Sequence, residues 1–166
     1  MTLVILTGAS GSGKTTIAGE FSRRHSNFAE TCCFDSIGVP TPDAMIREYG
    51  SGEEWQRVKT LDWLAKLSVR LAISPILFEG QMRLAFIREG AKAAQISDYA
   101  LVLLDCDDRT RRQRLAVERR QADLASEEMM NWARYLRDEA MATDTKILDT
   151  SSISVSEAVD TVRRHF

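Results

Sequence analysis

The chain has 166 residues, of which 44% are hydrophobic and 28% are charged, and its formal net charge is −2. This length and composition are typical of one globular domain with a sizeable core. The near-neutral charge excludes the global basic field that attracts nucleic acid, and no apolar run approaches the length of a membrane span. The first residues lack a signal-peptide pattern. We therefore expect a cytoplasmic monomer or homodimer without a membrane or nucleic-acid partner.

Short apolar runs alternate with longer segments of helical period, which is the pattern of a parallel α/β sheet. Strands are expected at residues 2–6, 30–34, 75–78, 100–104 and 146–148. Helices are expected at residues 14–24, 43–49, 53–73, 84–94, 108–120, 127–141 and 155–164. These segments predict a three-layer, doubly wound, five-stranded parallel sheet in a single domain of residues 1–166. The strand at residues 100–104 is the most apolar, so we expect it at the centre of the sheet.

A glycine-rich motif, Gly8-Ala-Ser-Gly-Ser-Gly13-Lys14-Thr15, joins the first predicted strand to the first predicted helix. It matches the G-x-x-x-x-G-K-[ST] phosphate-binding pattern, and the flanking strand and helix are the context that this pattern requires. Its glycines let backbone amides turn inward toward a phosphate, beside the positive end of the helix. Lys14 would bridge the outer phosphates of a nucleotide, and the Thr15 hydroxyl would bind Mg²⁺. The residues expected to contact the nucleotide here are Gly8, Gly11, Ser12, Gly13, Lys14, Thr15 and Thr16.

Ligands of doubly wound sheets bind at the carboxyl ends of the strands, which brings distant segments of the chain together. The segments that follow predicted strand ends, besides the glycine loop, are Asp35, residues 79–83, residues 105–108 and residues 149–152. Glu79 lies where a carboxylate often supports Mg²⁺ through water, and its alternative role is to fix Arg83 or a loop. Asp105 is expected to cap the next helix.

Arginines are concentrated in the helix expected at residues 108–120. They are Arg109, Arg111, Arg112, Arg114, Arg119 and Arg120. Such a run is either a solvated basic face or a lid that closes over the triphosphate and neutralises charge on the transferred phosphoryl group. We favour a lid at about residues 109–125, because a phosphate loop precedes it and a polar break follows. Helical spacing places Arg111, Arg114 and Arg119 on one face, which leaves Arg109 and Arg112 at the surface.

The order of elements over the whole chain resembles that of the small P-loop kinases: nucleoside-monophosphate kinases, shikimate kinase, gluconate kinase and chloramphenicol phosphotransferase. The resemblance implies ATP as the phosphoryl donor, with Mg²⁺. Residues 114–119 are similar to the R-L-x-x-R start of the family's lid, which implies that Arg114 and Arg119 are catalytic residues that contact the phosphates. Residues 76–83 are similar to the strand and D-G-F-P-R segment of adenylate kinases, where the arginine holds the acceptor's phosphate, which implies acceptor binding by Arg83. Residues 43–47 faintly resemble the acceptor-site D-M-L-R and imply the same for Arg47.

Asp35, at the end of the second predicted strand, has two interpretations. In shikimate kinase an aspartate in the comparable place approaches the acceptor hydroxyl. The resemblance implies that Asp35 orients that hydroxyl and takes its proton late in the transfer. The alternative is an aspartate that caps the following loop. We expect the insert at about residues 36–73 to form the acceptor pocket.

These observations predict an ATP- and Mg²⁺-dependent kinase that transfers the γ-phosphate to a small metabolite or nucleotide. An anionic acceptor is favoured, because arginine binds carboxylate and phosphate through paired hydrogen bonds. The alternatives without an acceptor are a GTPase and a regulatory nucleotide-binding protein. Residues 35–38 match the D-x-x-G of GTPases, but the guanine-reading N-K-x-D is absent from the sequence. The arginine-rich lid argues against a protein that only binds nucleotide.

Overall fold

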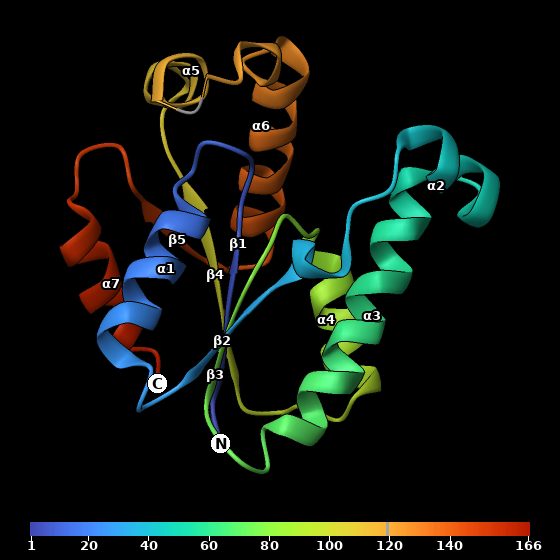
Figure 1. The fold of residues 1–166 in the computed structure, drawn as a ribbon, viewed down its shortest axis with the longest axis vertical. Coiled ribbons are helices and arrows are strands. Elements are labelled where there is room, and N and C mark those ends of the chain that lie inside the picture. The colour runs from blue at the N-terminus through green and yellow to red at the C-terminus, as the bar shows by residue number, and fades with distance from the viewer. Residues whose placement is uncertain (119) are drawn as a thin grey trace.

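The computed structural model describes residues 1–118 and 120–166, and its sheet has five strands, all parallel (Figure 1). The strands are β1 (Leu3–Thr7), β2 (Glu30–Cys33), β3 (Ile76–Glu79), β4 (Tyr99–Asp105) and β5 (Lys146–Asp149). Their order in the sheet is β2-β3-β1-β4-β5. This arrangement confirms the predicted doubly wound α/β fold.

Strand β1 is the central strand, because it pairs with β3 on one side and with β4 on the other. All of its residues are buried: Leu3 and Ile5 pack into the core on one face, and Val4 and Leu6 into the core on the other. The prediction that the strand at residues 100–104 is central is wrong, since β4 lies one position away from the centre. Apolar composition identifies strands covered on both faces, but it does not identify their neighbours in the sheet.

Helices cover both faces of the sheet and make three layers (Figure 1). They are α1 (Lys14–His25), α2 (Pro42–Tyr49), α3 (Gly52–Arg70), α4 (Leu84–Ala93), α5 (Asp108–Gln113), α6 (Glu127–Ala142) and α7 (Val155–Arg163). Helices α1 and α7 pack on one face, and α3 and α4 pack on the other. Helix α6 adds a smaller core on the second face, in which Ala133 and Leu136 contact Leu103 of β4.

Two predicted elements end early, and each continues as a short helix that is not an α-helix. Strand β2 ends at Cys33, and the next residues form a 3-10 helix, η1 (Phe34–Ile37), which buries the Phe34 ring and lets the Phe34 carbonyl accept from Trp63 Nε1 at 3.2 Å. The helix expected at residues 108–120 is α5 followed by a π-helical segment, η2 (Arg114–Glu118). Single π-helical turns occur frequently at functional sites.

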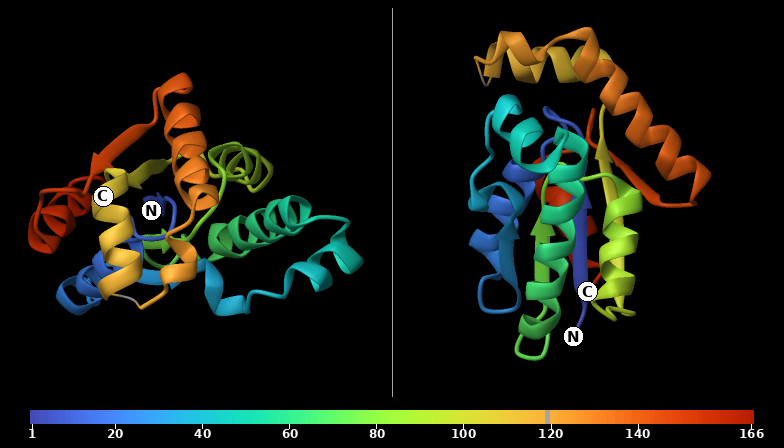
Figure 2. Two further views of the ribbon diagram at one scale, coloured as in Figure 1. Left: turned by 90° about the horizontal axis from the view of Figure 1, so that it is seen from above. Right: turned by 90° about the vertical axis from the view of Figure 1, so that its right-hand side faces the viewer.

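Two parts of the chain extend beyond the carboxyl ends of the strands (Figure 2). One is α2 with the start of α3, and α2 itself contains no buried residue. The other is formed by α5, η2, the short 3-10 helix η3 (Ala122–Leu124) and the start of α6. Among the described residues, no helix combines the length and the apolar character needed to cross a membrane.

Two helical glycines provide a matched test of the packing between α3 and α4. A Cβ on Gly90 of α4 would lie 2.6 Å from the Leu64 Cδ1 of α3, whereas a Cβ on Gly19 of α1 would meet no atom within 4 Å. We predict that Gly90→Ala lowers the free energy of unfolding by about 1–3 kcal/mol through overpacking. Gly19→Ala should raise it by about 0.5–1 kcal/mol through helix propensity. Urea denaturation measures both, and a Gly90→Ala variant as stable as Gly19→Ala would contradict the packing described here.

Candidate active site

A cleft of about 420 Å³ lies beside the glycine loop, at the carboxyl edge of the sheet. Its walls come from the loop and the start of α1, from η2, and from the segment between β5 and α7. The lining residues are Gly11, Gly13, Lys14, Thr15, Thr16, Ile17, Arg114, Glu118, Thr150, Ile153, Ser154, Val155 and Ala158. Six of the residues predicted to bind nucleotide therefore line one cleft: five come from the glycine loop and the start of α1, and the sixth, Arg114, comes from η2.

The glycine loop adopts backbone angles and close contacts that only glycine tolerates well. Gly11 and Gly13 have φ values of 80° and 94°, in the left-handed region that favours glycine. A Cβ on Gly8 would lie 2.3 Å from the Leu104 carbonyl oxygen, so β4 approaches the loop too closely for any other residue. Gly13 immediately precedes α1 without a side-chain cap, and the first turn of α1 has no acidic residue. The first amides of α1 therefore remain available to an anion.

The side chains of the loop divide into buried and exposed groups. Lys14 is 9% exposed, and its Nζ donates to the Ala9 carbonyl at 3.1 Å, which holds the ammonium group over the loop. Thr15 and Thr16 are exposed at the cleft. Ser12 is fully buried and its amide donates to the Ala9 carbonyl, so its side chain lies beneath the loop and not on the cleft wall.

The carbonyl groups of the loop have partners outside the loop. The Ser10 carbonyl accepts from Arg111 Nη1 at 2.7 Å, and the Gly11 carbonyl accepts from Arg114 Nη1 at 3.3 Å. The Ser12 carbonyl accepts from the Thr150 hydroxyl at 2.9 Å. Residues after β4 and β5 therefore fix the conformation of a loop that follows β1.

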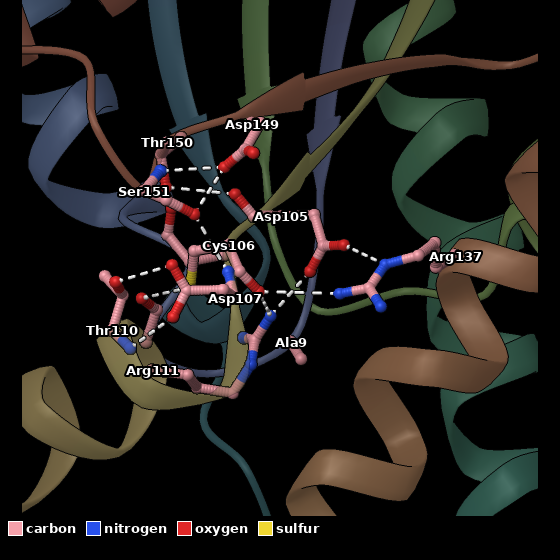
Figure 3. A network of polar contacts seen from close by, with 12 residues as sticks. Ala9, Asp105, Cys106, Asp107, Thr110, Arg111, Arg137, Asp149, Thr150 and Ser151 are labelled. Carbon is pink, nitrogen blue, oxygen red and sulfur yellow. Dashed lines mark hydrogen bonds and ion pairs between the residues drawn. The ribbon is translucent and has the colours of Figure 1, made fainter.

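Arg111 and Asp105 differ from their predicted roles (Figure 3). Arg111 does not share an open lid face with Arg114: it is fully buried, and its Nη2 lies 2.6 Å from Asp105 Oδ1. Arg137 of α6 reaches the other oxygen of the same carboxylate at 2.5 Å. Asp105 is thus a buried ion-pair partner and not a helix cap. Asp107 caps α5 instead, and the Thr110 amide and hydroxyl hold the pKa of Asp107 below its ordinary value.

The other arginines of the expected lid have different environments. Arg114 lines the cleft, and its guanidinium donates to the Thr150 carbonyl at 2.7 Å and to the Thr150 hydroxyl at 2.9 Å. Arg112 lies at the surface, as expected, and bonds Glu127 and the Ala125 carbonyl. Arg119 lies outside the described residues, so its predicted contact with phosphate stays a prediction.

The residues predicted to bind the acceptor, and the predicted metal ligand Glu79, lie outside the cleft lining. Asp35 is exposed in η1, where its carbonyl accepts from the Gly38 amide at 3.0 Å. Glu79 is 3% exposed at the end of β3, beside Cys33. Burial raises the pKa of the Cys33 thiol to about 11, and the Glu79 carboxylate adds to this increase. Arg47 is largely exposed on α2 and pairs with its neighbour Glu48.

Arg83 lies in an environment that the sequence did not indicate. Its guanidinium donates to Glu53 of α3 at 3.0 Å. The same group lies 4.8 Å from the centre of the Tyr135 ring and 5.1 Å from that of Trp132, two rings of α6 that stack on each other. These cation–π contacts and the ion pair hold the guanidinium between α3 and α6.

Sequence reasoning missed three parts of this arrangement. Thr150 bonds the loop, Arg137 pairs with Asp105, and the Trp132–Tyr135 pair flanks Arg83. The sequence places Thr150 only within residues 149–152, a segment that follows a predicted strand. Its hydroxyl nevertheless reaches a carbonyl of the glycine loop. Arg137 is one of two arginines in α6, and no local pattern distinguishes it. Only the packing of α6 beside β4 brings it to Asp105.

The comparisons with known proteins agree with this fold. The family model described as an AAA domain matches residues 4–135, and the chain belongs to this family. A search of curated protein sequences gave no match.

Solved structures of small P-loop kinases have the same fold. Shikimate kinase from Acinetobacter baumannii, in complex with shikimate, is similar with a TM-score of 0.66 and 19% identity, over 98% of this chain and 90% of that one. A gluconokinase from Sinorhizobium meliloti 1021 is similar with a TM-score of 0.65 and 17% identity, over 99% and 90%. Shikimate kinase from Bacteroides thetaiotaomicron gives a TM-score of 0.67 and 15% identity, over 98% and 97%. At these identities the likeness establishes the fold of a small P-loop kinase.

The Thr150 hydroxyl provides a test of how the loop is held. It bonds the Ser12 carbonyl and the Asp105 carbonyl, and it accepts from Arg114. We predict that Thr150→Val lowers the free energy of unfolding by about 1–3 kcal/mol, because it leaves a buried carbonyl without its donor. Thr150→Ser keeps the hydroxyl and is the control, with a smaller loss. Denaturant unfolding of both variants checks this, and equal stabilities would show that the hydroxyl is unimportant.

Proposed function

We propose that this protein is an ATP- and Mg²⁺-dependent kinase that transfers the γ-phosphate to a small, anionic metabolite or nucleotide. The observation that carries the proposal is the cleft in which Lys14, Thr15 and Arg114 converge on the open end of α1. Two cations and a set of free amides beside a hydroxyl suit a polyphosphate with its metal ion. The kinases of similar fold support the same class of reaction.

The residues present fit both ligands. The left-handed Gly11 and Gly13 give the loop the curvature that a phosphate chain needs, and a Cβ on Gly11 would press on the Arg111 Cγ at 3.1 Å. Mg²⁺ prefers oxygen ligands and keeps several waters, so the exposed Thr15 hydroxyl would be a ligand in the cleft, and Glu79, which does not line the cleft, would support the ion only through water. When bound, the metal ion would neutralise charge on the phosphate oxygens. Among the described residues there is no larger cluster of acidic, histidine or cysteine side chains to hold a metal.

In the proposed reaction each side chain has a positioning or charge-neutralising role. Lys14 and Arg114 bind the phosphate oxygens and stabilise the charge that develops as the phosphoryl group leaves. Arg119 would add a third cation from the lid. Asp35 orients the acceptor hydroxyl and accepts its proton late in the transfer. The lid at about residues 109–125 and the acceptor insert at about residues 36–73 would exclude water from the transferred group.

The anionic nature of the acceptor is supported by Arg83. Its guanidinium is oriented by the two rings of α6, and its partner Glu53 is more than half exposed. A carboxylate or phosphate on the acceptor can replace Glu53 at the guanidinium through paired hydrogen bonds. Arg47, whose side chain is 71% exposed on α2 and does not line the cleft, would be a second cation for the acceptor.

Lys14→Ala tests the catalytic proposal directly. We predict that it abolishes phosphoryl transfer, with a loss of at least about 100-fold, while circular dichroism remains that of the native fold. The assay is ADP release with ATP and Mg²⁺ against a panel of sugar acids, hydroxy acids of the shikimate type and nucleoside monophosphates. Undiminished turnover by Lys14→Ala would sink the proposal. If the native protein binds ATP and no acceptor supports ADP release, a regulatory nucleotide-binding role is favoured.

Asp35→Asn separates the acceptor base from a structural role. We predict that it removes most of the transfer, by about 100-fold or more, and leaves ATP affinity unchanged, because a carboxamide cannot accept the proton. Calorimetric ATP titration and the same ADP-release assay give the two readouts. Transfer at the native rate would mean that Asp35 only shapes its loop.

A further inference from the structure

The proposed reaction gives no role to the Arg111 guanidinium. It is fully buried, although arginine is almost never buried without a specific partner. Its Nη1 donates to the Ser10 carbonyl at 2.7 Å, and its Nη2 lies 2.6 Å from Asp105 Oδ1 and 3.3 Å from the Cys106 carbonyl. One planar group thereby joins the phosphate loop to the end of β4.

We infer that Arg111 is a positioning residue for the nucleotide: its buried guanidinium holds the phosphate loop in the conformation that binds phosphate. The inference rests on the proposed function, because it assigns a role within the same donor site. Arg111 does not line the cleft, and it acts through the loop backbone.

The geometry of the loop explains why such a residue is needed. A loop that turns its amides toward a phosphate turns neighbouring carbonyls away from it, and buried carbonyls need donors. Ser10 lies at the middle of the loop, and the Arg111 side chain supplies the donor to its carbonyl. The packing is equally close: a Cβ on Gly11 would lie 3.1 Å from the Arg111 Cγ and 3.3 Å from its carbonyl oxygen. Movement of Arg111 would therefore move the loop.

The ion pair holds Arg111 in place. The buried Arg111 guanidinium is neutralised by the Asp105 carboxylate, which also pairs with the partly exposed Arg137. The carboxylate therefore fixes one end of the guanidinium while the other end bonds the loop.

A role in stability alone accounts poorly for this arrangement. Buried ion pairs are often replaced by apolar residues without loss of stability. Arg111 Nε is moreover buried without a hydrogen-bond partner among the described residues, which is unfavourable for folding. An apolar residue could fill the volume, but it could not donate to the Ser10 carbonyl.

Arg137 supplies a matched control, because it pairs with the same carboxylate and its other contact is the Cys106 carbonyl, outside the loop. The test compares Arg111→Lys with Arg137→Lys. A single ammonium at position 111 can keep the charge beside Asp105, but it cannot reproduce the fork that also reaches Ser10. We expect Arg111→Lys to weaken ATP binding by about tenfold or more, and Arg137→Lys to change it by less than about twofold.

The measurement is calorimetric ATP titration with Mg²⁺ at a temperature well below the unfolding midpoint of each variant, with the midpoints recorded in parallel. A purely structural residue would lower the midpoint and leave the ATP Kd unchanged, so native-like ATP binding by Arg111→Lys overturns the inference. Equal weakening by both variants overturns it as well. If the native protein binds ATP and Arg111→Lys binds it equally, only this inference fails. If the native protein binds no nucleotide, the proposed function fails together with it.

Discussion

The structure depends on the requirement that the backbone of the glycine loop turns its amides toward the cleft while its carbonyls stay satisfied on the other side. Glycine meets the first half of this requirement, through the positive φ angles of Gly11 and Gly13. The second half is met from outside the loop, by Arg111, Arg114 and Thr150. A loop with these angles and no external donors would lose buried hydrogen bonds and would not hold one conformation.

The parallel sheet makes those external donors available. Because β4 lies directly beside β1, the segment that follows β4 emerges next to the loop that follows β1. Strand β5 is the next neighbour, and its following residue Thr150 donates from its amide to the Asp105 carbonyl at the end of β4. Because all residues of β1 are buried, the carboxyl end of this strand is held in place by the core on both faces of the sheet. The site is therefore precise because its parts begin on neighbouring strands of a rigid core.

The sequence predicted the parts of this arrangement that are local. The Gly8–Lys14 spacing depends on backbone angles within one loop, and alternating apolar and helical segments define the parallel sheet without knowledge of contacts. The arginines after β4 are different: helical spacing predicted one lid face for Arg111 and Arg114, but Arg111 is fully buried against Asp105 and Arg114 lines the cleft. Which arginine is buried depends on Asp105 and on α6, and α6 lies beside β4 only in three dimensions. The same limit applies to Arg83, whose aromatic neighbours come from α6.

The donor and acceptor sides of the proposed site differ in how their cations are held. On the donor side, Lys14 and Arg114 line the cleft and bond backbone carbonyls of the loop and its surroundings, so in the proposed site a nucleotide would find them already oriented. On the acceptor side, Arg83 pairs with the Glu53 carboxylate, and in the proposed site an acceptor anion would have to displace that carboxylate before it binds. The displacement would lower the affinity for the acceptor, but it would select against neutral compounds, which cannot form an ion pair with the guanidinium as Glu53 does. The rings of α6 reduce the entropic part of this cost, because they keep the guanidinium in place while its partner changes. An acceptor selected in this way would carry a carboxylate or a phosphate group, which can accept two parallel hydrogen bonds from the guanidinium.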